Sequence, residues 1–247
     1  MLIILPPSET KAHGGLEAPL DFDTLSFPSL NPVRRSIAAD LAALDVDQAL
    51  DVLGISEKLR AEAESNRALF SSPTMPAILR FTGVLYDALD AHSLSRDAWS
   101  RLAVGDALFG IVMATDLIPH YRLSGGTKLP EHNSTATAPT MKKRWGKAIT
   151  EALSAYEGLI IDMRSGTYQQ LGKIADAVTI RVESVQPDGS RKVVSHFNKH
   201  YKGILARVLA ESPVEAHTID DLCTIATQAG LVIEHNGTRE LTLVVTP

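Results

Sequence analysis

The 247-residue sequence is poor in cysteine and in aromatic residues. It contains a single cysteine, Cys223, and only 5% Phe, Trp and Tyr. One cysteine excludes an intramolecular disulfide and any zinc site that needs two or more thiolates, and it suits a reducing compartment. The aromatic residues are not interleaved with the basic ones, as a stacking platform for single-stranded nucleic acid requires. Any nucleic acid partner is therefore expected to be duplex or otherwise structured DNA.

Long hydrophobic runs and the common catalytic motifs are also missing. The longest apolar run, residues 107–114, is far shorter than the roughly 20 residues that a membrane span needs. No signal peptide is readable at the amino terminus, so we expect a cytoplasmic protein with no membrane partner. The chain lacks a phosphate loop, a dinucleotide fingerprint, a serine elbow and an H-E-x-x-H sequence, so no cofactor is predicted.

Charge is segregated along the chain, although the net charge is only −5. Residues 121–207 contain 14 Lys and Arg against 7 Asp and Glu, whereas residues 211–247 contain 1 against 6. Residues 189–210 include no acidic residue at all. Such a stretch is either a solvated helix face or a surface that attracts phosphate groups. Its basic residues are Arg191, Lys192, Lys199, Lys202 and Arg207.

Hydrophobic patterning predicts a single α+β or mixed α/β domain over residues 1–247. The helical block at about 31–104 could form a lobe. Turn residues predict two hairpins, one around 186–189 and one around the Asn-Gly pair at 236–237. The predicted strands are 1–5, 158–163, 177–185, 192–197, 231–234 and 241–245. The predicted helices are 32–44, 46–53, 56–69, 75–90, 95–104, 141–156, 199–210 and 218–229.

Polar side chains follow two of the predicted buried strands. If these strands belong to one sheet, a ligand crevice is expected at their ends. The converging groups could be catalytic acids, bases and orienting groups, or they could form a structural network; both interpretations stay open. The candidates for a catalytic role are Ser8, Glu9, Asp162, Ser165 and Tyr168.

Residues 49–63 have the outline of a helix–hairpin–helix. An apolar helix ends at Gly54, Ile55 follows, and Ser56 can act as the N-cap of the next helix. In that motif the turn presents backbone N–H groups to a DNA phosphate. The usual form has glycine where this chain has Ser56, and the segment is acidic. An ordinary packing connection between two helices is the alternative.

Residues 195–207 combine basic and small side chains. The helix is expected to begin near Asn198. The side of this helix opposite its apolar face would then consist of Lys199, Gly203 and Ala206, and the small residues there would let an anion approach closely. His196 and His200 are four residues apart, but no third ligand is evident. No metal site is therefore predicted, and direct iron binding has no ligand cluster to support it.

Several segments together resemble the YaaA family of bacterial peroxide stress proteins. They are residues 5–11, 81–86, 108–123, 165–168 and 195–203. The resemblance implies a mixed α/β fold in which helices surround a mixed sheet and form a basic cleft. It also implies a DNA-binding protein that carries a helix–hairpin–helix, protects DNA under oxidative stress and is associated with low intracellular iron.

The resemblance also assigns binding residues by position. The hairpin would be Gly54, Ile55, Ser56 and Lys58, and the cleft would be lined by Lys11, Arg122, Arg164, Lys199, Lys202 and Arg207. This chain departs from the family pattern at Glu9, where the family has a lysine.

Two hypotheses follow. The first is a non-enzymatic stress protein that binds the DNA backbone without reading base sequence. The second is an enzyme that acts on a phosphorylated or nucleotide-like small molecule in the same cleft.

Overall fold

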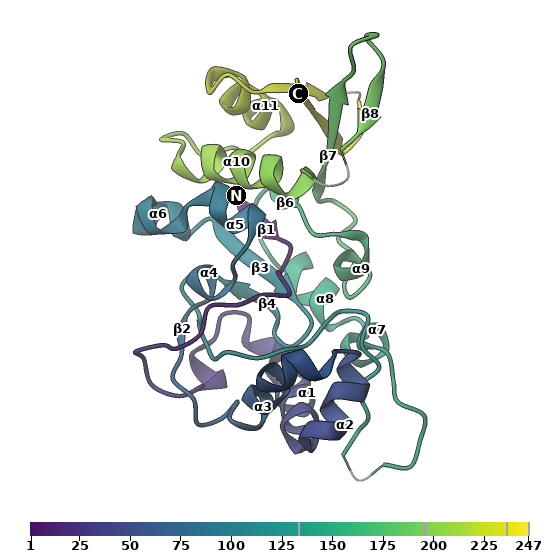
Figure 1. Ribbon diagram of the computed structural model, residues 1–247. Coiled ribbons are helices and arrows are strands. Elements are labelled where there is room, and N and C mark those ends of the chain that lie inside the picture. The colour runs from purple at the N-terminus through teal and green to yellow at the C-terminus, as the bar shows by residue number, and fades with distance from the viewer. Residues whose placement is uncertain (133, 195–196, 236, 247) are drawn as a thin grey trace.

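The structure, a computed structural model, describes residues 1–132, 134–194, 197–235 and 237–246. Its main element is an eight-stranded mixed sheet in the order β4-β3-β1-β6-β7-β10-β9, with β8 paired to β7 (Figure 1). A separate ribbon pairs β2 (Met75–Pro76) with β5 (Leu117–Ile118). The strands of the main sheet are β1 (Leu2–Leu5), β3 (Leu102–Asp106), β4 (Gly110–Met113), β6 (Ile160–Asp162), β7 (Val178–Val185), β8 (Arg191–Val193), β9 (Val232–His235) and β10 (Glu240–Val245).

The middle of the sheet is parallel and buried. β1 lies between β3 and β6 and runs parallel to both, and every residue of the three strands is buried. Strands that are covered on both faces have few polar positions, so they consist of nearly continuous apolar runs. Because the three strands are parallel, their carboxyl ends meet at one edge of the sheet, and this edge positions the polar residues that follow.

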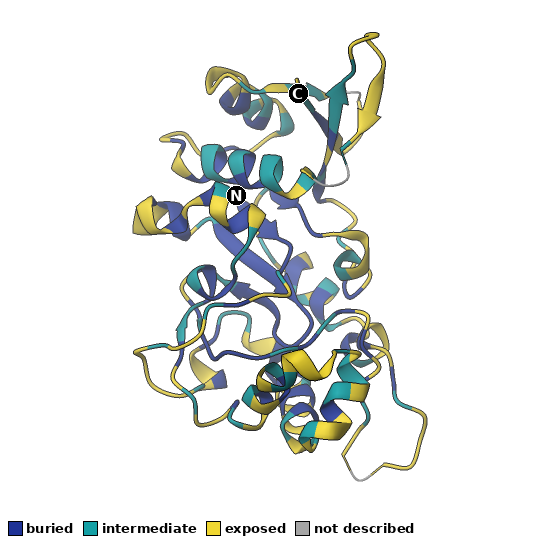
Figure 2. Cartoon of the chain, viewed as in Figure 1, coloured by how far each residue is buried: buried dark blue, intermediate teal, exposed yellow. Residues whose placement is uncertain are grey.

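Helices cover the sheet from two sides of the molecule. In Figure 1, α1, α2 and α3 gather at the lower end, whereas α5, α6 and α10 lie beside β1 nearer the upper end. The helices expected as one lobe over 31–104 therefore lie in two groups. Figure 2 shows that the buried residues concentrate in the sheet and on the helix faces turned toward it. The α-helices are α1 (Asn31–Ala43), α2 (Val46–Leu53), α3 (Arg60–Arg67), α4 (Ala77–Arg80), α5 (Val84–Leu89), α6 (Arg96–Trp99), α7 (Met141–Trp145), α8 (Ala148–Ser154), α9 (Gly166–Gln169), α10 (Asn198–Glu211) and α11 (Ile219–Gln228).

The packing of α10 against α5 depends on a glycine. A Cβ atom built on Gly203 would lie 2.3 Å from the carbonyl oxygen of Leu85, which is closer than two such atoms can approach. Gly203 and Ala206 are both buried. The prediction that these small residues admit an anion is therefore wrong, because both are covered by the fold and Gly203 packs against α5.

Most of the predicted architecture is confirmed. The chain forms one mixed α/β domain around a mixed sheet, and both hairpins are present as the antiparallel pairs β7–β8 and β9–β10. Asn236, at the second turn, lies outside the described residues. The predicted helix over 95–104 is wrong in its second half, where β3 begins. Two other predicted helices are interrupted at Gly83 and Gly146, whose φ angles are +99° and +54°.

No helix within the described ranges has the length and apolar character needed to cross a membrane.

Candidate phosphate-binding site

A pocket of about 210 Å³ opens where β1 ends. It is lined by residues 6–10 of the loop after β1, by residues 82–86 at the start of α5, and by Lys199 of α10. We call it the β1-end pocket. Three segments that are far apart in the sequence thus bring polar groups into one hollow at the carboxyl edge of the sheet.

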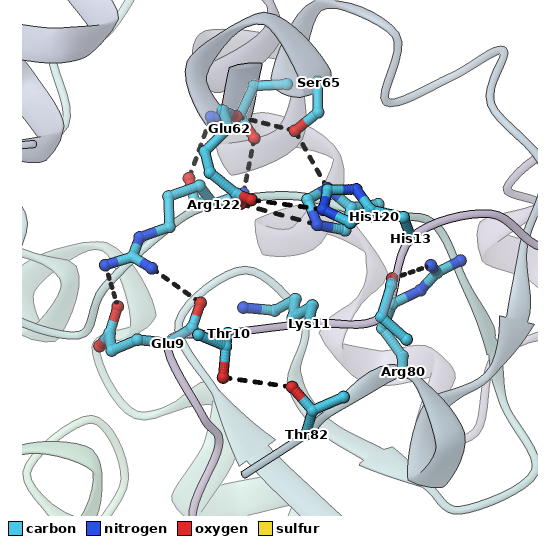
Figure 3. A network of polar contacts seen from close by, with 12 residues as sticks. Glu9, Thr10, Lys11, His13, Glu62, Ser65, Arg80, Thr82, His120 and Arg122 are labelled. Carbon is cyan, nitrogen blue, oxygen red and sulfur yellow. Dashed lines mark hydrogen bonds and ion pairs between the residues drawn. The ribbon is translucent and has the colours of Figure 1, made fainter. Parts of the chain in front are cut away.

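Three hydroxyl groups form a network at this pocket. Ser8 Oγ accepts a hydrogen bond from the Thr82 backbone N–H (3.2 Å) and donates to the carbonyl of Thr10. Thr82 Oγ1 donates to Thr10 Oγ1 (3.1 Å; Figure 3). Hydroxyl groups of this kind commonly bind phosphate oxygens. Among these residues only Ser8 was singled out from the sequence.

Lys199 supplies the positive charge at the rim of the pocket. It lies in the first turn of α10 and is exposed. Within the described residues every ion pair is formed by an arginine, a histidine or the amino terminus, and no lysine takes part. The Lys199 ammonium is therefore available to a ligand.

Glu9 and Arg122 form an ion pair beside the pocket. The Arg122 Nη2 atom lies 3.0 Å from Glu9 Oε2, and Nη1 donates to the Glu9 carbonyl (2.8 Å; Figure 3). The backbone of Arg122 is held in turn by the side chain of Asn66, through bonds of 2.8 and 3.0 Å. Both predicted residues lie at the site, but Glu9 neutralises much of the charge that Arg122 would offer to a phosphate.

The family resemblance implied that Lys11 lines the cleft, but Lys11 does not lie at the pocket surface. It is 7% exposed, and its ammonium donates to the Ser8 carbonyl (3.2 Å) and lies 4.4 Å from the centre of the Tyr121 ring. Burial lowers the pKa of Lys11 to about 8, although the nearby Asp106 carboxylate opposes this shift. Lys11 therefore supports the loop from below.

Asp106 and Tyr121 complete this support and were missed in the sequence. The Tyr121 hydroxyl donates to Asp106, and burial raises the pKa of the Asp106 carboxyl. Asp106 is the last residue of β3. Recognising 102–106 as a strand would have placed Asp106 beside the end of β1.

Asp162 and Arg164 stabilise the fold and do not face the pocket. They form a buried pair in which Arg164 Nε and Nη2 donate to the two carboxylate oxygens, each at 2.8 Å. Arg164 also donates to the carbonyl of Gly172 (2.8 Å). With 2% of its surface exposed, Arg164 cannot line a cleft, and the paired Asp162 is not free to act as an acid or a base.

The two remaining catalytic candidates lie on α9 and just before it. Ser165 is exposed at the N-cap position, without a capping hydrogen bond from its side chain. The Tyr168 hydroxyl accepts from the Gly125 N–H (3.2 Å), and burial raises the pKa of Tyr168 to about 12. Tyr168 therefore stays protonated near neutral pH and cannot serve as a base.

The other two basic residues of α10 are bound to neighbouring elements. The Lys202 ammonium donates to the Met163 carbonyl (3.2 Å), and burial lowers its pKa. Arg207 donates to the Leu89 carbonyl and pairs with Glu211, each at 2.9 Å. His196 lies outside the described residues.

The predicted hairpin is a turn between α2 and α3, which we call the α2–α3 turn (Gly54, Ile55 and Ser56). Gly54 has a φ of +64° and ends α2, whereas the Ser56 side chain makes no capping hydrogen bond. Lys58 is exposed next to the turn. The turn lies at the amino end of α3, whereas Asn66, near the other end, contacts Arg122. It is not part of the β1-end pocket.

The structure also corrects the prediction that no metal-ligand cluster exists. His13, Glu62 and His120 place three potential ligand atoms within 4.8 Å of one another. Their positions in the sequence are too far apart for a spacing motif to reveal them.

Comparison with known proteins gives consistent matches over nearly the full length. The family model described as peroxide stress protein YaaA matches residues 1–236. A UPF0246 protein of Corynebacterium glutamicum is 67% identical over 247 residues, covering 99% of this chain and 100% of the relative. A UPF0246 protein of Corynebacterium efficiens is 64% identical over 247 residues, with the same coverage of both chains. A UPF0246 protein of Streptomyces coelicolor is 41% identical over 220 residues, covering 85% of this chain and 82% of the relative.

Proposed function

Because the chain belongs to the YaaA family of peroxide stress proteins, we propose that it binds the phosphate backbone of duplex or structured DNA, without reading the base sequence, at the β1-end pocket. On the family resemblance alone, we extend this proposal to a cytoplasmic oxidative stress response that limits intracellular iron and DNA damage.

The observation that carries the proposal is the position of Lys199. Its exposed ammonium lies at the rim of a pocket that also contains the hydroxyl network of Ser8, Thr10 and Thr82. A lysine ammonium with neighbouring hydroxyl groups is a common arrangement for contacts to the DNA backbone. Such contacts hold the backbone but do not distinguish bases, which agrees with binding that is independent of sequence.

The α2–α3 turn is the second contact that the family resemblance implies. Its neighbour Lys58 is exposed, but Arg60 pairs there with Asp47 (2.7 Å) and with Glu57. These carboxylates would repel a phosphate at the turn. We therefore place the main contact at Lys199 and assign Gly54, Ile55, Ser56 and Lys58 a smaller part.

The salt dependence of duplex binding tests the proposal. Each neutralised phosphate contributes about −0.9 to the slope of log affinity against log salt. Replacing Lys199 by glutamine should reduce the magnitude of the slope by about 0.9 and weaken binding to all sequences alike. Lys173→Gln is the matched control, because Lys173 is also exposed but lies outside the pocket. An unchanged slope in Lys199→Gln would remove the pocket from the DNA proposal.

A second candidate is an enzyme that acts on a phosphorylated or nucleotide-like small molecule. The size of the pocket favours it, because 210 Å³ suits one phosphate group and part of its carrier better than a long backbone. Ser8 and Glu9 would then contact the ligand. Absence of DNA binding at low salt, together with saturable binding of a nucleotide that Lys199→Gln weakens, would favour this candidate over the first.

A further inference from the structure

His13, Glu62 and His120 come from three segments that meet beside the loop after β1, and we call them the histidine cluster. His13 belongs to that loop, Glu62 to α3, and His120 to the segment that follows β5 (Figure 3). The Glu62 carboxylate faces the edges of both imidazoles, with Oε1 3.7 Å from His13 Nε2 and Oε2 3.6 Å from His120 Nε2. The rings are stacked, with their centroids 4.3 Å apart.

The hydrogen bonds around His120 favour one tautomer of its ring. Ser65 Oγ donates its hydrogen to the Glu62 carbonyl (2.7 Å). The same oxygen lies 3.2 Å from His120 Nδ1, and with its hydrogen directed to Glu62 it accepts there from a protonated Nδ1. His120 Nε2 then presents a lone pair toward Glu62. A histidine that binds a metal through one nitrogen typically donates from the other in this way.

Two acceptor atoms therefore face each other in a buried place. Glu62 Oε2 and His120 Nε2 are both buried without a hydrogen-bond partner among the described residues, and the His120 side chain is only 8% exposed. Buried polar atoms are rarely left unpaired. With the His120 proton on Nδ1, neither atom can donate a hydrogen bond to the other, and a cation bound between them would satisfy both.

We propose that His13, Glu62 and His120 bind a divalent first-row transition metal ion of the Zn²⁺ and Fe²⁺ class. Two imidazole nitrogens and one carboxylate oxygen are ligands that these ions prefer, whereas Mg²⁺ and Ca²⁺ prefer oxygen ligands alone. In a tetrahedral site with bonds of about 2.1 Å, neighbouring ligand atoms lie about 3.4 Å apart. The three ligand atoms lie within 4.8 Å of one another. Binding therefore requires the side chains to draw together and the stacked imidazole rings to turn until both nitrogen lone pairs point at the ion.

The surroundings define the type of site. The His13 side chain is 74% exposed, so one side of the metal would remain open to water and exchangeable ligands. The positive charges of the nearby Arg80 and Lys11 oppose the binding of any cation, so the affinity must come from the coordinate bonds of the imidazole and carboxylate ligands. The site would join α3 to the segment that contains Arg122. It does not depend on the proposed DNA binding.

Metal titration of the full chain tests the proposal. After removal of metal with a chelator, we expect Zn²⁺ to bind with a stoichiometry of one by calorimetry, and Co²⁺ to give visible absorption bands of a site with nitrogen ligands. His13→Ala should weaken binding by about tenfold or more without disturbing the fold, because its side chain is exposed. Glu62→Gln should have the same effect. His92→Ala is the matched control, since His92 is exposed and outside the cluster, and a Cys223→Ser background removes the one thiol. Equal affinity in His13→Ala and the control, or no binding at micromolar metal, would overturn the proposal.

A second readout examines the proton directly. Nitrogen NMR of the metal-free protein should show His120 with its proton on Nδ1, and Zn²⁺ should shift the Nε2 resonance in the unsubstituted chain but not in His13→Ala. A proton on Nε2 in the metal-free protein would pair that atom with Glu62 and would overturn the proposal.

Discussion

The β1-end pocket and the α2–α3 turn both carry cations that the sequence associates with phosphate, yet they use their charge differently. Beside the turn, Arg60 is paired on the surface with Asp47 and Glu57. Near the pocket, Arg164 is paired below the surface with Asp162, and Lys199 remains free above it. The comparison teaches that a basic residue is available to a ligand only where the fold does not pair it with a carboxylate.

The largest loss of stability is expected when one partner of the buried Arg164–Asp162 pair is removed. Arg164→Leu would leave the Asp162 carboxylate buried without its partner, and such losses cost about 3–5 kcal/mol of stability. Arg60→Leu removes the two ion pairs that Arg60 forms at the surface with Asp47 and Glu57, and it should leave the midpoint of urea unfolding almost unchanged. Similar midpoints for the two variants would mean that the Arg164 pair is no more important to the fold than a surface pair.

Substituting two glycines, Gly203 near the pocket and Gly54 in the α2–α3 turn, should cause smaller losses of stability. Gly203→Ala forces a Cβ against the Leu85 carbonyl, and overpacking of this kind costs about 1–3 kcal/mol. Gly54→Ala meets no atom within 4 Å but must adopt a φ of +64°, which costs about 1 kcal/mol. Thermal unfolding of both variants measures the difference. A larger loss for Gly54→Ala would show that helix packing at α10 tolerates the added methyl group.

The smallest effect is expected for Lys58→Gln, which tests whether the α2–α3 turn contacts DNA as strongly as the β1-end pocket does. Lys58→Gln should change the salt slope of duplex binding by clearly less than the value of about 0.9 expected for Lys199→Gln, because carboxylates surround the turn. Both variants are compared over the same series of salt concentrations. Equal changes in slope would place the α2–α3 turn on the DNA together with the pocket.

The parts of the fold that the sequence predicted well are those with a local signal. Leu2–Leu5 and Ile160–Asp162 are short apolar runs followed by polar loops, and they pair as parallel neighbours. The first three residues of the strand Leu102–Asp106 were predicted as the end of a helix over 95–104. The strand is buried on both faces, so it shows no alternation, and an apolar run of this length fits either structure.

The site was less predictable because it depends on contacts between distant segments. Nothing local distinguishes the buried Lys11 from the exposed Lys199; the difference arises because Tyr121 and Phe81 cover the first. The histidine cluster likewise requires positions 13, 62 and 120 to meet in space. Pairing of Arg164 with Asp162 was equally hidden, although the two residues are neighbours in sequence.

The separate uses of arginine and lysine have a chemical consequence. Apart from the buried Lys11 and half-buried Lys202, all the lysines are exposed, and none of the ten joins an ion pair within the described part of the chain. Acetylation, which neutralises amines but leaves guanidinium groups untouched, would therefore neutralise the exposed lysines and preserve the arginine pairs of the fold. Under the proposed function, this modification would weaken the contact with the DNA backbone and leave those arginine pairs intact.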